Sequence, residues 1–561
     1  MNPELEAVAR QMAEAAARSL ADGRSSFPTA WPRALVTLLR DRPKAFEEAL
    51  AGLYADLGSV AQDILAGPAG DAVADDPAQW PWFRLVRRQH QAWERFCTRL
   101  ATLAALGGDA DGRRLALALR QWVAAADPDN SLATNPAALC RARDSGGASL
   151  RRGLAHLARD LRRGRIAMSD EAALRPGVEV ASTPGEVVRE WELCQLIRYR
   201  SAGSRVRGRP LLVVPPFINR FYVLDLQPSN SFVRFAVARG LEVYLVSWRN
   251  AGPATAAAGW DDYLRQGVLE PLTAVTERSQ ASRPHLLGHC IGGTLSAAAA
   301  AWLEARGAAL PSTLTLLTTL LDFTEAGELA DLVDEEGLRA LETLGPGVVP
   351  AGRVAAAFSG LRPRELVWHF VVHNYLMGET PPVMDLLHWN GDGLDVPAPL
   401  LAQVLRQLYH ENRLARPGNL QVLGSAVDLG RVHLPVYGVG ALRDHIVPWQ
   451  SAWAGLRLLG GRHRFALASG GHVAGVVCPP DGRPGREYRA GPASGAGAPD
   501  WLAATAARSG SWWQDWAAWI ARHGGGWRTV APGPPSDALE PAPGRYVLEP
   551  AAAGAGTAPA S

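Results

Sequence analysis

Lysine is almost missing from this chain. Among its 561 residues, with 57 Lys and Arg together, Lys44 is the only lysine. A P-loop needs a lysine after its glycines, and pyridoxal phosphate needs one for its Schiff base. Lys44 stands in Arg-Asp-Arg-Pro-Lys, with no glycine loop before it. The sequence therefore excludes the P-loop ATPase, kinase and pyridoxal phosphate classes.

Paired cysteines, long apolar runs and excess charge are also lacking. The five cysteines form no C-x-x-C pair, so we expect neither a metal site nor a redox dithiol, and no cofactor. No uncharged apolar run reaches the roughly 18 residues of a membrane span, and the N-terminus lacks signal-peptide features. The net charge is only +2, without a basic cluster, which argues against nucleic-acid binding. We expect a soluble, cytoplasmic protein with no transmembrane segment.

The chain changes character near residue 195. Residues 1–195 read as a helical N-terminal domain, with helical spacing of apolar residues around 10–20, 92–106, 113–125 and 148–163. In residues 196–547, short apolar runs predict strands separated by helical stretches; these runs are 211–216, 242–248, 285–290, 314–321, 435–440 and 464–468. This alternation predicts an α/β fold with a parallel sheet covered on both faces.

Three other segments break the strand rhythm. Residues 323–432 are mostly helical and rich in Leu and aromatic residues, so we expect an inserted cap. Residues 482–499 are rich in Gly, Pro and Ala and are predicted to form a loop. The same bias follows residue 532, and we expect a disordered tail over 548–561.

The strongest chemical signal is a cysteine between glycines. Gly288-His-Cys-Ile-Gly-Gly293 follows an apolar strand and precedes an Ala-rich helix, which is the nucleophile-elbow pattern with cysteine in place of serine. The tight turn exposes the Cys290 thiol at a helix N-terminus, where the helix dipole favours thiolate. It also positions the backbone N–H of Ile291 to hold an oxyanion. The alternative is a buried structural cysteine.

A nucleophile of this kind needs a base and an orienting acid. In this fold the acid and then the histidine follow the nucleophile along the chain. Asp444 and His472 each follow a predicted strand, where α/β sheets place ligands. Spacing leaves alternatives open, which are His445 as the base and Asp322 as the acid. We expect His289 and His285 to be packing residues.

Further motifs lie along much of the chain beyond the Cys290 box. They are PPFINRFYVLD at 215–225, NSFVR at 230–234, SWRN at 247–250, GWDDY at 259–263, LLDF at 320–323, NYLMG at 374–378, LLHWN at 386–390, DHIVPW at 444–449, SGGHVAGVV at 469–477, GSWW at 510–513 and APGRYV at 542–547. Together these motifs resemble the polyhydroxyalkanoate synthases of class I. NSLATNP at 130–136 and RGRIAMSD at 163–170 resemble the family's N-terminal domain. The resemblance covers about residues 115–547.

The resemblance implies an α/β-hydrolase core with a Cys290–His472–Asp444 triad and a mobile cap. It also implies a second oxyanion donor in the backbone near Phe217, and dimer contacts through the cap stretch that contains Trp389. The N-terminal domain would serve association with polyester granules, dimerisation or both, and we expect no separate partner subunit. Three positions depart from the family pattern: Phe217 replaces a common Trp, His289 another aromatic, and Cys478 a common Asn.

The implied activity is that of an acyltransferase. It would polymerise (R)-3-hydroxyacyl-CoA, with 3-hydroxybutyryl-CoA as the expected substrate, into a polyester through an acyl-cysteine, releasing coenzyme A. Its partners would be that substrate, the growing polyester chain, the granule surface and a second copy of the chain. The alternatives are a thioesterase or polyester hydrolase of the same fold, a non-catalytic granule coat protein, and a synthase for medium-length monomers.

Overall fold

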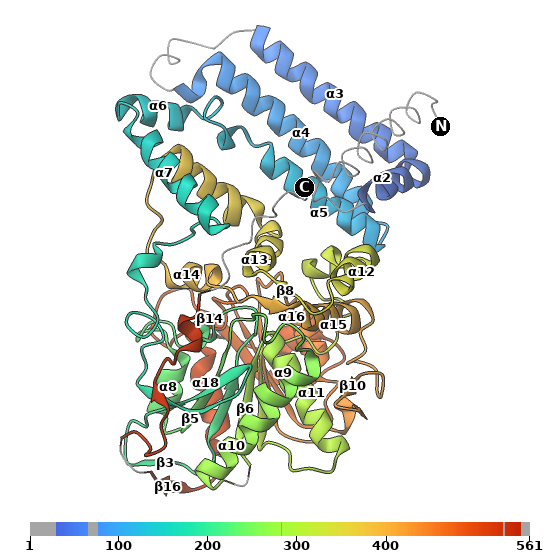
Figure 1. The fold of residues 1–561 in the computed structure, drawn as a ribbon. Coiled ribbons are helices and arrows are strands. Elements are labelled where there is room, and N and C mark those ends of the chain that lie inside the picture. The colour runs from blue at the N-terminus through green and yellow to red at the C-terminus, as the bar shows by residue number, and fades with distance from the viewer. Residues whose placement is uncertain (1–29, 66–76, 282, 531–532, 551–561) are drawn as a thin grey trace. The chain divides into compact units, whose positions relative to one another are not determined.

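The computed structural model describes residues 30–65, 77–281, 283–530 and 533–550, and the predicted helix at 10–20 lies outside them. The described chain forms two compact units (Figure 1). The helical unit falls within residues 1–168 and 356–381, and the sheet unit within 169–355 and 382–561. The sequence placed the division at 195 and assigned 323–432 to a single insertion. The units instead divide after Met168, and residues 356–381 belong to the helical unit.

The helical unit is built from α2 (Ala30–Asp41), α3 (Pro43–Leu65), α4 (Pro81–Ala105), α5 (Ala110–Ala125), α6 (Pro136–Asp144) and α7 (Ala148–Arg163). Side chains satisfy the first free amides of two helices: Asp109 accepts from Gly112 N at 2.6 Å, and Asn135 accepts from Ala138 N at 2.9 Å. Gly164, with φ of 69°, ends α7 in the left-handed conformation that favours glycine. The predicted helices near 92–106, 113–125 and 148–163 are found in α4, α5 and α7.

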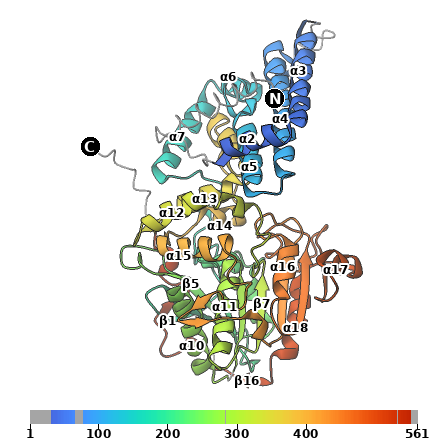
Figure 2. The same ribbon diagram turned by 90° about the vertical axis from the view of Figure 1, so that its right-hand side faces the viewer.

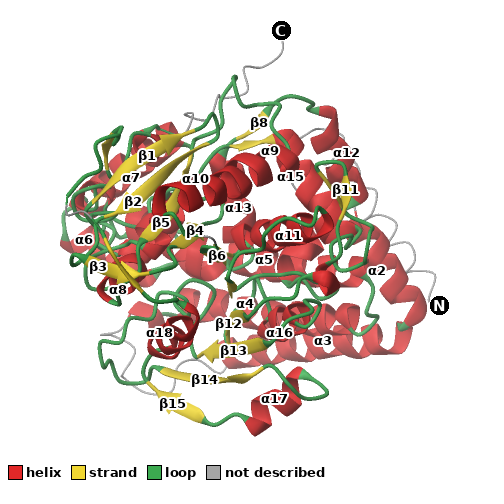
Figure 3. Cartoon of the chain, turned by 90° about the horizontal axis from the view of Figure 1, so that it is seen from below, coloured by secondary structure: helices red, strands yellow, loops and turns green. Residues whose placement is uncertain are grey.

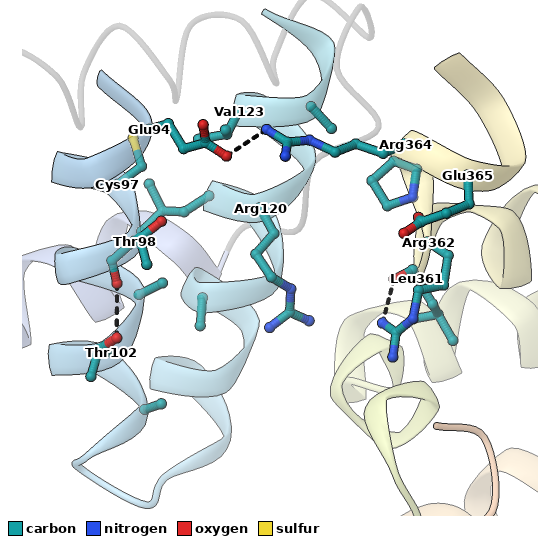
Figure 4. A pocket seen from close by; sticks show the side chains of 16 residues that line it. Glu94, Cys97, Thr98, Thr102, Arg120, Val123, Leu361, Arg362, Arg364 and Glu365 are labelled. Atoms are coloured by element: carbon teal, nitrogen blue, oxygen red, sulfur yellow. Dashed lines mark hydrogen bonds and ion pairs between the residues drawn. The ribbon is translucent and has the colours of Figure 1, made fainter. Parts of the chain in front are cut away.

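Residues 356–381 return to the helical unit after the first part of α13 (Ala351–Gly360). They contain π-helical turns over Arg364–Trp368 and Val371–Leu376. A cavity of about 560 Å³ lies between α4, α5 and residues 361–365 (Figure 4). An ion pair of 2.6 Å joins Arg364 to Glu94 beside it. None of the residues that the sequence proposed as catalytic lines this cavity.

The sheet unit contains an eleven-stranded sheet in the order β15-β14-β13-β12-β7-β6-β4-β5-β2-β1-β17. The strands are β1 (Gly185–Glu190), β2 (Cys194–Tyr199), β4 (Leu211–Val214), β5 (Val243–Trp248), β6 (His285–His289), β7 (Thr313–Leu317), β12 (Val436–Ala441), β13 (His463–Ala468), β14 (Glu487–Pro492), β15 (Ala507–Ser509) and β17 (Glu540–Pro541). The six predicted strands are the six central ones, and they pair in parallel. Antiparallel strands, which the sequence did not predict, extend both edges.

Helices cover both faces of the sheet, as the continuous apolar strands predicted. In β4, Leu212 and Val214 join one core and Leu211 and Val213 join the other, because successive side chains point to opposite faces. The first core packs against α9 (Trp260–Leu264), α10 (Glu270–Ser279), α11 (Ile291–Ala305) and α16 (Trp449–Leu456). The second packs against α8 (Phe232–Ala238) and α18 (Trp512–His523), seen on the other side of the sheet in Figure 3.

Smaller elements complete the sheet unit. Its part of the predicted insertion holds α12 (Glu335–Thr343), α14 (Asp385–Gly391), α15 (Ala398–Gln403) and a π-helical stretch, Val404–His410. Two-stranded ribbons pair β3 (Arg205–Arg207) with β16 (Trp527–Thr529), β8 (Val348–Val349) with β9 (Val396–Pro397), and β10 (Gln421–Val422) with β11 (Ser425–Ala426).

Two predictions of irregular chain were wrong in part. Residues 482–499 contain β14 and the start of α17 (Ala498–Ala504), a helix that packs beside α16 (Figure 2). After residue 532, β17 pairs with β1, and Tyr546 and Val547 are buried. Of the tail over 548–561, residues 551–561 lie outside the described chain. Within the described residues, no helix is both long and apolar enough to cross a membrane.

Candidate active site

Cys290 lies in the sharp turn between β6 and α11. Its φ of 53° and ψ of −127° are strained for a residue with a side chain, as a nucleophile elbow requires. Close packing explains the glycines: a Cβ atom on Gly288 would lie 2.4 Å from Gly293 Cα, and one on Gly292 would lie 2.4 Å from Val214 O. The glycines therefore let the turn pack against itself and against the end of β4.

The strain extends to the neighbouring strand. Cys290 N donates to Leu317 O, the last residue of β7, at 2.9 Å. Thr318 follows with φ of 40°, and its N–H donates to Val439 O of β12 at 2.7 Å. Non-glycine residues with such positive φ values persist only where surrounding contacts hold them, and they gather at functional sites.

Asp444 and His472 meet at the carboxyl ends of β12 and β13. The Nδ1 atom of His472 lies 2.7 Å from Asp444 Oδ2. The other carboxylate oxygen of Asp444 accepts from the backbone N–H groups of Ile446 at 2.9 Å and Val447 at 2.8 Å. The Asp444 side chain has 0% exposure and that of His472 10%. The carboxylate is thus fixed by the loop that carries it and directed at the imidazole.

The electrostatics of the site favour the protonated form of His472. Burial lowers the pKa of His472, but the charges of Asp444 and Cys290, with hydrogen bonding to both, raise it well above its ordinary value. Because hydrogen bonding to Cys290 is one of these causes, we take the cysteine and the imidazole to be neighbours in the site. The arrangement can therefore hold a proton on His472.

Two further histidines lie on β6. His289 is 0% exposed, and its ring lies roughly parallel to that of His472, with centroids 5.9 Å apart and an angle of 27° between planes. Both of its ring nitrogens lack a hydrogen-bond partner, and burial, followed by the charge of His472, lowers its pKa to about 3. His285 bonds Thr313 Oγ1 through Nδ1 at 2.8 Å. Both are packed within the core, as the sequence predicted.

Asp322 and His445, which the sequence offered as the alternative acid and base, make other contacts. The carboxylate of Asp322 accepts from Thr324 N at 2.9 Å, from Thr324 Oγ1 at 2.6 Å and from Asn412 Nδ2 at 2.8 Å. It thus anchors the loop after β7. The backbone carbonyl of His445 accepts from Glu328 N at 3.4 Å. The histidine that bonds Asp444 Oδ2 is His472.

The proposed oxyanion donors flank the elbow. Ile291 is the first residue of α11, so its N–H has no acceptor within that helix. Phe217 lies beyond β4, 2% exposed, with its ring edge-on to Tyr263 at 5.2 Å and to Trp248 at 6.3 Å between centroids. The loop that carries Phe217 lies against the elbow, because a Cβ on Gly292 would be 2.5 Å from Pro215 O.

Comparison with known proteins shows the family to which the chain belongs. Residues 73–236 match the family model described as the N-terminus of poly-beta-hydroxybutyrate polymerase (PhaC), and residues 210–477 match the alpha/beta hydrolase fold. Poly(3-hydroxyalkanoate) polymerase subunit PhaC of Cupriavidus necator is 44% identical over 465 residues, which cover 81% of this chain and 78% of that one. The chain belongs to the poly(3-hydroxyalkanoate) polymerase family.

Two other members match a slightly larger share of the chain at lower identity. The polymerase subunit PhaC of Rhizobium meliloti is 35% identical over 522 residues, covering 89% of this chain and 84% of that one. The polymerase of Methylorubrum extorquens is 34% identical over 502 residues, covering 86% and 82%. The family and the α/β-hydrolase fold expected from the motifs are therefore confirmed.

One residue of the candidate site was missed by sequence reasoning. Burial raises the pKa of Tyr409, and the charges of Cys290 and Asp444 raise it further, so its hydroxyl lies within their electrostatic reach. Tyr409 belongs to the π-helical stretch Val404–His410, and its ring contacts Phe323 at 4.9 Å between centroids. No motif or strand end marks this tyrosine in the sequence, so only the folded chain reveals it.

Trp389, which the resemblance linked to the dimer contact, is an internal residue of the sheet unit. It is 5% exposed, and its indole N–H donates to Arg220 O at 2.7 Å. Its side chain therefore supports the segment around 220 and is not displayed on the surface of the chain.

Proposed function

We propose that the protein polymerises (R)-3-hydroxyacyl groups from coenzyme A thioesters into a polyester, with Cys290 as the nucleophile. The observation that carries this proposal is the placement of Cys290 in a strained elbow, beside a histidine that bonds a buried carboxylate at 2.7 Å. Family membership supplies the class of substrate and product, since the relatives are named poly(3-hydroxyalkanoate) polymerases.

The first step is acyl transfer to the enzyme. Cys290 gives its proton to His472, and the resulting thiolate attacks the thioester carbonyl. When the tetrahedral intermediate collapses, the carbon–sulfur bond to coenzyme A breaks, and His472 returns the proton to the departing thiolate. One thioester replaces another, so a cysteine nucleophile suits this step better than serine.

The second step transfers the acyl group to a hydroxyl. The 3-hydroxyl of another acyl unit or of the chain end attacks an acyl thioester while His472 takes its proton. The new ester bond forms and a cysteine thiol is regenerated. Asp444 keeps the Nδ1 side of the imidazole occupied, so that Nε2 is the nitrogen that exchanges protons with substrate and thiol.

Both steps pass through an oxyanion that needs hydrogen-bond donors. We assign the backbone N–H of Ile291 as one donor and a backbone N–H near Phe217 as the other. Donors fixed by a helix start and by a packed loop need no rearrangement as charge develops, and this is the main advantage of such a site.

The setting of the reaction remains a prediction. We expect the chain to work in the cytoplasm at the surface of polyester granules, as a homodimer, without a separate partner subunit, metal or cofactor. Sedimentation of the purified protein tests the dimer, and its co-sedimentation with washed granules tests the surface association.

The direct test follows coenzyme A release and polymer growth together. Purified protein with (R)-3-hydroxybutyryl-CoA is expected to release coenzyme A while turbidity rises, and Cys290→Ala is expected to abolish both. Cys140→Ala is the matched control, because Cys140 is a partly buried cysteine of α6, in the other unit. Release of free 3-hydroxybutyrate without polymer would contradict the proposal and indicate a thioesterase.

A further inference from the structure

A second polar cavity lies in the sheet unit, away from Cys290. It has a volume of about 400 Å³ and is lined by Arg198 of β2, Arg278 of α10 and Arg528 of β16. Glu242, also in its wall, precedes β5, whereas Cys290 follows β6, which runs in the same direction. The cavity therefore lies at the amino ends of these parallel strands, whereas the nucleophile lies at their carboxyl ends. Figure 1 shows β16 and α10 at the end of the sheet unit away from α12 and α15.

Glu242 holds two of the three arginines together. It is 2% exposed, and one oxygen accepts from Arg198 Nε at 2.8 Å and from the Tyr244 hydroxyl at 3.2 Å. Its other oxygen accepts from Arg528. One buried carboxylate thus faces two guanidinium groups, which leaves a positive charge that it does not balance.

One buried donor of these arginines remains unused. Arg528 Nε is buried and lacks a hydrogen-bond partner. Arg198, by contrast, bonds Glu242 through Nε. A buried N–H without an acceptor is costly, so such groups usually meet a ligand or water.

The third arginine has a partner that an incoming anion could replace. Arg278 bonds both carboxylate oxygens of Asp537, each at 2.6 Å. The Asp537 side chain is 62% exposed and that of Arg278 only 20%. Hydrogen bonding to Asp537 raises the pKa of Arg278, whereas the charge of Arg198 acts in the opposite direction. Arg198 and Arg278 therefore repel each other across the cavity, and the carboxylate that pairs with Arg278 is the exposed one of Asp537.

We propose that this cavity binds a phosphate group, held by Arg198, Arg278 and Arg528. Guanidinium groups pair with phosphate oxygens through two parallel hydrogen bonds and keep their charge at every physiological pH. Glu242 does not oppose the ligand, because its oxygens already accept from two guanidinium groups and a hydroxyl. The carboxylate of Asp537 competes with the phosphate for Arg278. The phosphate has two possible sources, a free phosphate or pyrophosphate ion and the phosphates of coenzyme A.

The test is calorimetric titration of the full-length protein at constant ionic strength with inorganic phosphate, pyrophosphate and coenzyme A in turn. Arg278→Gln removes a ligand and is expected to weaken binding about tenfold or more. Asp537→Asn removes the competing carboxylate and is expected to tighten it several-fold. Arg339→Gln is the control, because Arg339 is 73% exposed on α12 and the charge change is the same.

Arg278→Gln is expected to lower the affinity for the probe and Asp537→Asn to raise it. If the Arg278–Asp537 pair only supported the fold, both variants would change the affinity in the same direction. Binding of free phosphate or pyrophosphate with the expected changes identifies a site for the free ion. If coenzyme A alone responds to Arg278→Gln and Asp537→Asn, its phosphates are the ligand. The proposal is overturned if no probe binds with a Kd of about 1 mM or lower, or if binding is the same in all variants. It does not depend on the polymerase activity.

Discussion

His472 Nδ1 lies 2.7 Å from Asp444 Oδ2, although the two residues are 28 positions apart in the chain. Each follows one of two adjacent parallel strands, β12 and β13, whose carboxyl ends meet at one edge of the sheet. The same edge carries Cys290 after β6. The parallel topology thus brings together three residues that are far apart in sequence.

Replacing Asp444 by Asn tests the orientation of His472. The amide keeps an oxygen for the N–H groups of Ile446 and Val447 but no longer stabilises an imidazolium. We expect kcat to fall about 10²–10⁴-fold. Asp322→Asn is the control, because Asp322 bonds Thr324 and Asn412 instead. Equal loss of coenzyme A release in both variants would contradict the assignment.

The raised pKa of His472 predicts how stability depends on pH. The folded protein holds the imidazole proton more tightly than the unfolded chain, in which the pKa is about 6.5. The stabilisation by His472 is therefore complete below that value and is lost as pH rises through the raised pKa. The difference in unfolding free energy between wild type and His472→Gln, measured in urea, should shrink with rising pH. A difference that grows toward alkaline pH would show the opposite shift.

The charges of Asp444 and Cys290 should contribute unequally to the raised pKa of His472. The charge of Asp444 raises the pKa of His472 more than that of Cys290 does. An NMR titration of labelled histidine should show a larger decrease of this pKa in Asp444→Asn than in Cys290→Ala. The reverse order would mean that the thiolate dominates.

Gly288→Ala tests the packing of the elbow. The added Cβ would lie 2.4 Å from Gly293 Cα, so the turn must move. We expect loss of activity and a destabilisation of about 1–3 kcal/mol in denaturant unfolding. At Gly252 an added Cβ meets nothing within 4 Å, so Gly252→Ala should leave both properties nearly unchanged. Retained activity in Gly288→Ala would show that the turn tolerates a side chain.

His289→Phe should stabilise the protein. Phe keeps a flat ring beside His472 and removes two buried nitrogens that have no partner, which is expected to add about 1–3 kcal/mol. His285→Phe should instead destabilise, because it leaves Thr313 Oγ1 without its bond of 2.8 Å. Urea unfolding of both variants measures the contrast. Destabilisation by His289→Phe would mean that the imidazole nitrogens have a role in the fold.

The central strands could be predicted because continuous runs of apolar residues indicate burial on both faces. Leu211–Val214 and Val243–Trp248 are continuous apolar runs, as expected for strands covered on both faces. The outer strands carry no such signal. In β1, Glu186 is buried because Arg200 bonds it, and β17 holds its place by pairing with β1. Such strands depend on partners distant in the chain, which local patterns do not reveal.

The candidate site could also be predicted in part, because several of its residues lie at the ends of the predicted strands. Cys290, Asp444 and His472 each stand at the end of a recognisable strand, so their residue types and order point to a triad. Tyr409 comes from a π-helical stretch, and its proximity to Cys290 depends on how residues 404–412 fold back to Asp322 and Phe323. No local pattern encodes that contact.

The measurement that tests the central claim most directly is mass spectrometry of the protein quenched in acid during turnover of (R)-3-hydroxybutyryl-CoA. The account predicts a 3-hydroxybutyryl adduct, or a short oligomer of it, on the peptide that contains Cys290. The adduct should be absent from Cys290→Ala and should accumulate when chain growth is slowed by low substrate. Coenzyme A release and polymer growth without any adduct on Cys290, or an adduct on another cysteine, would contradict it.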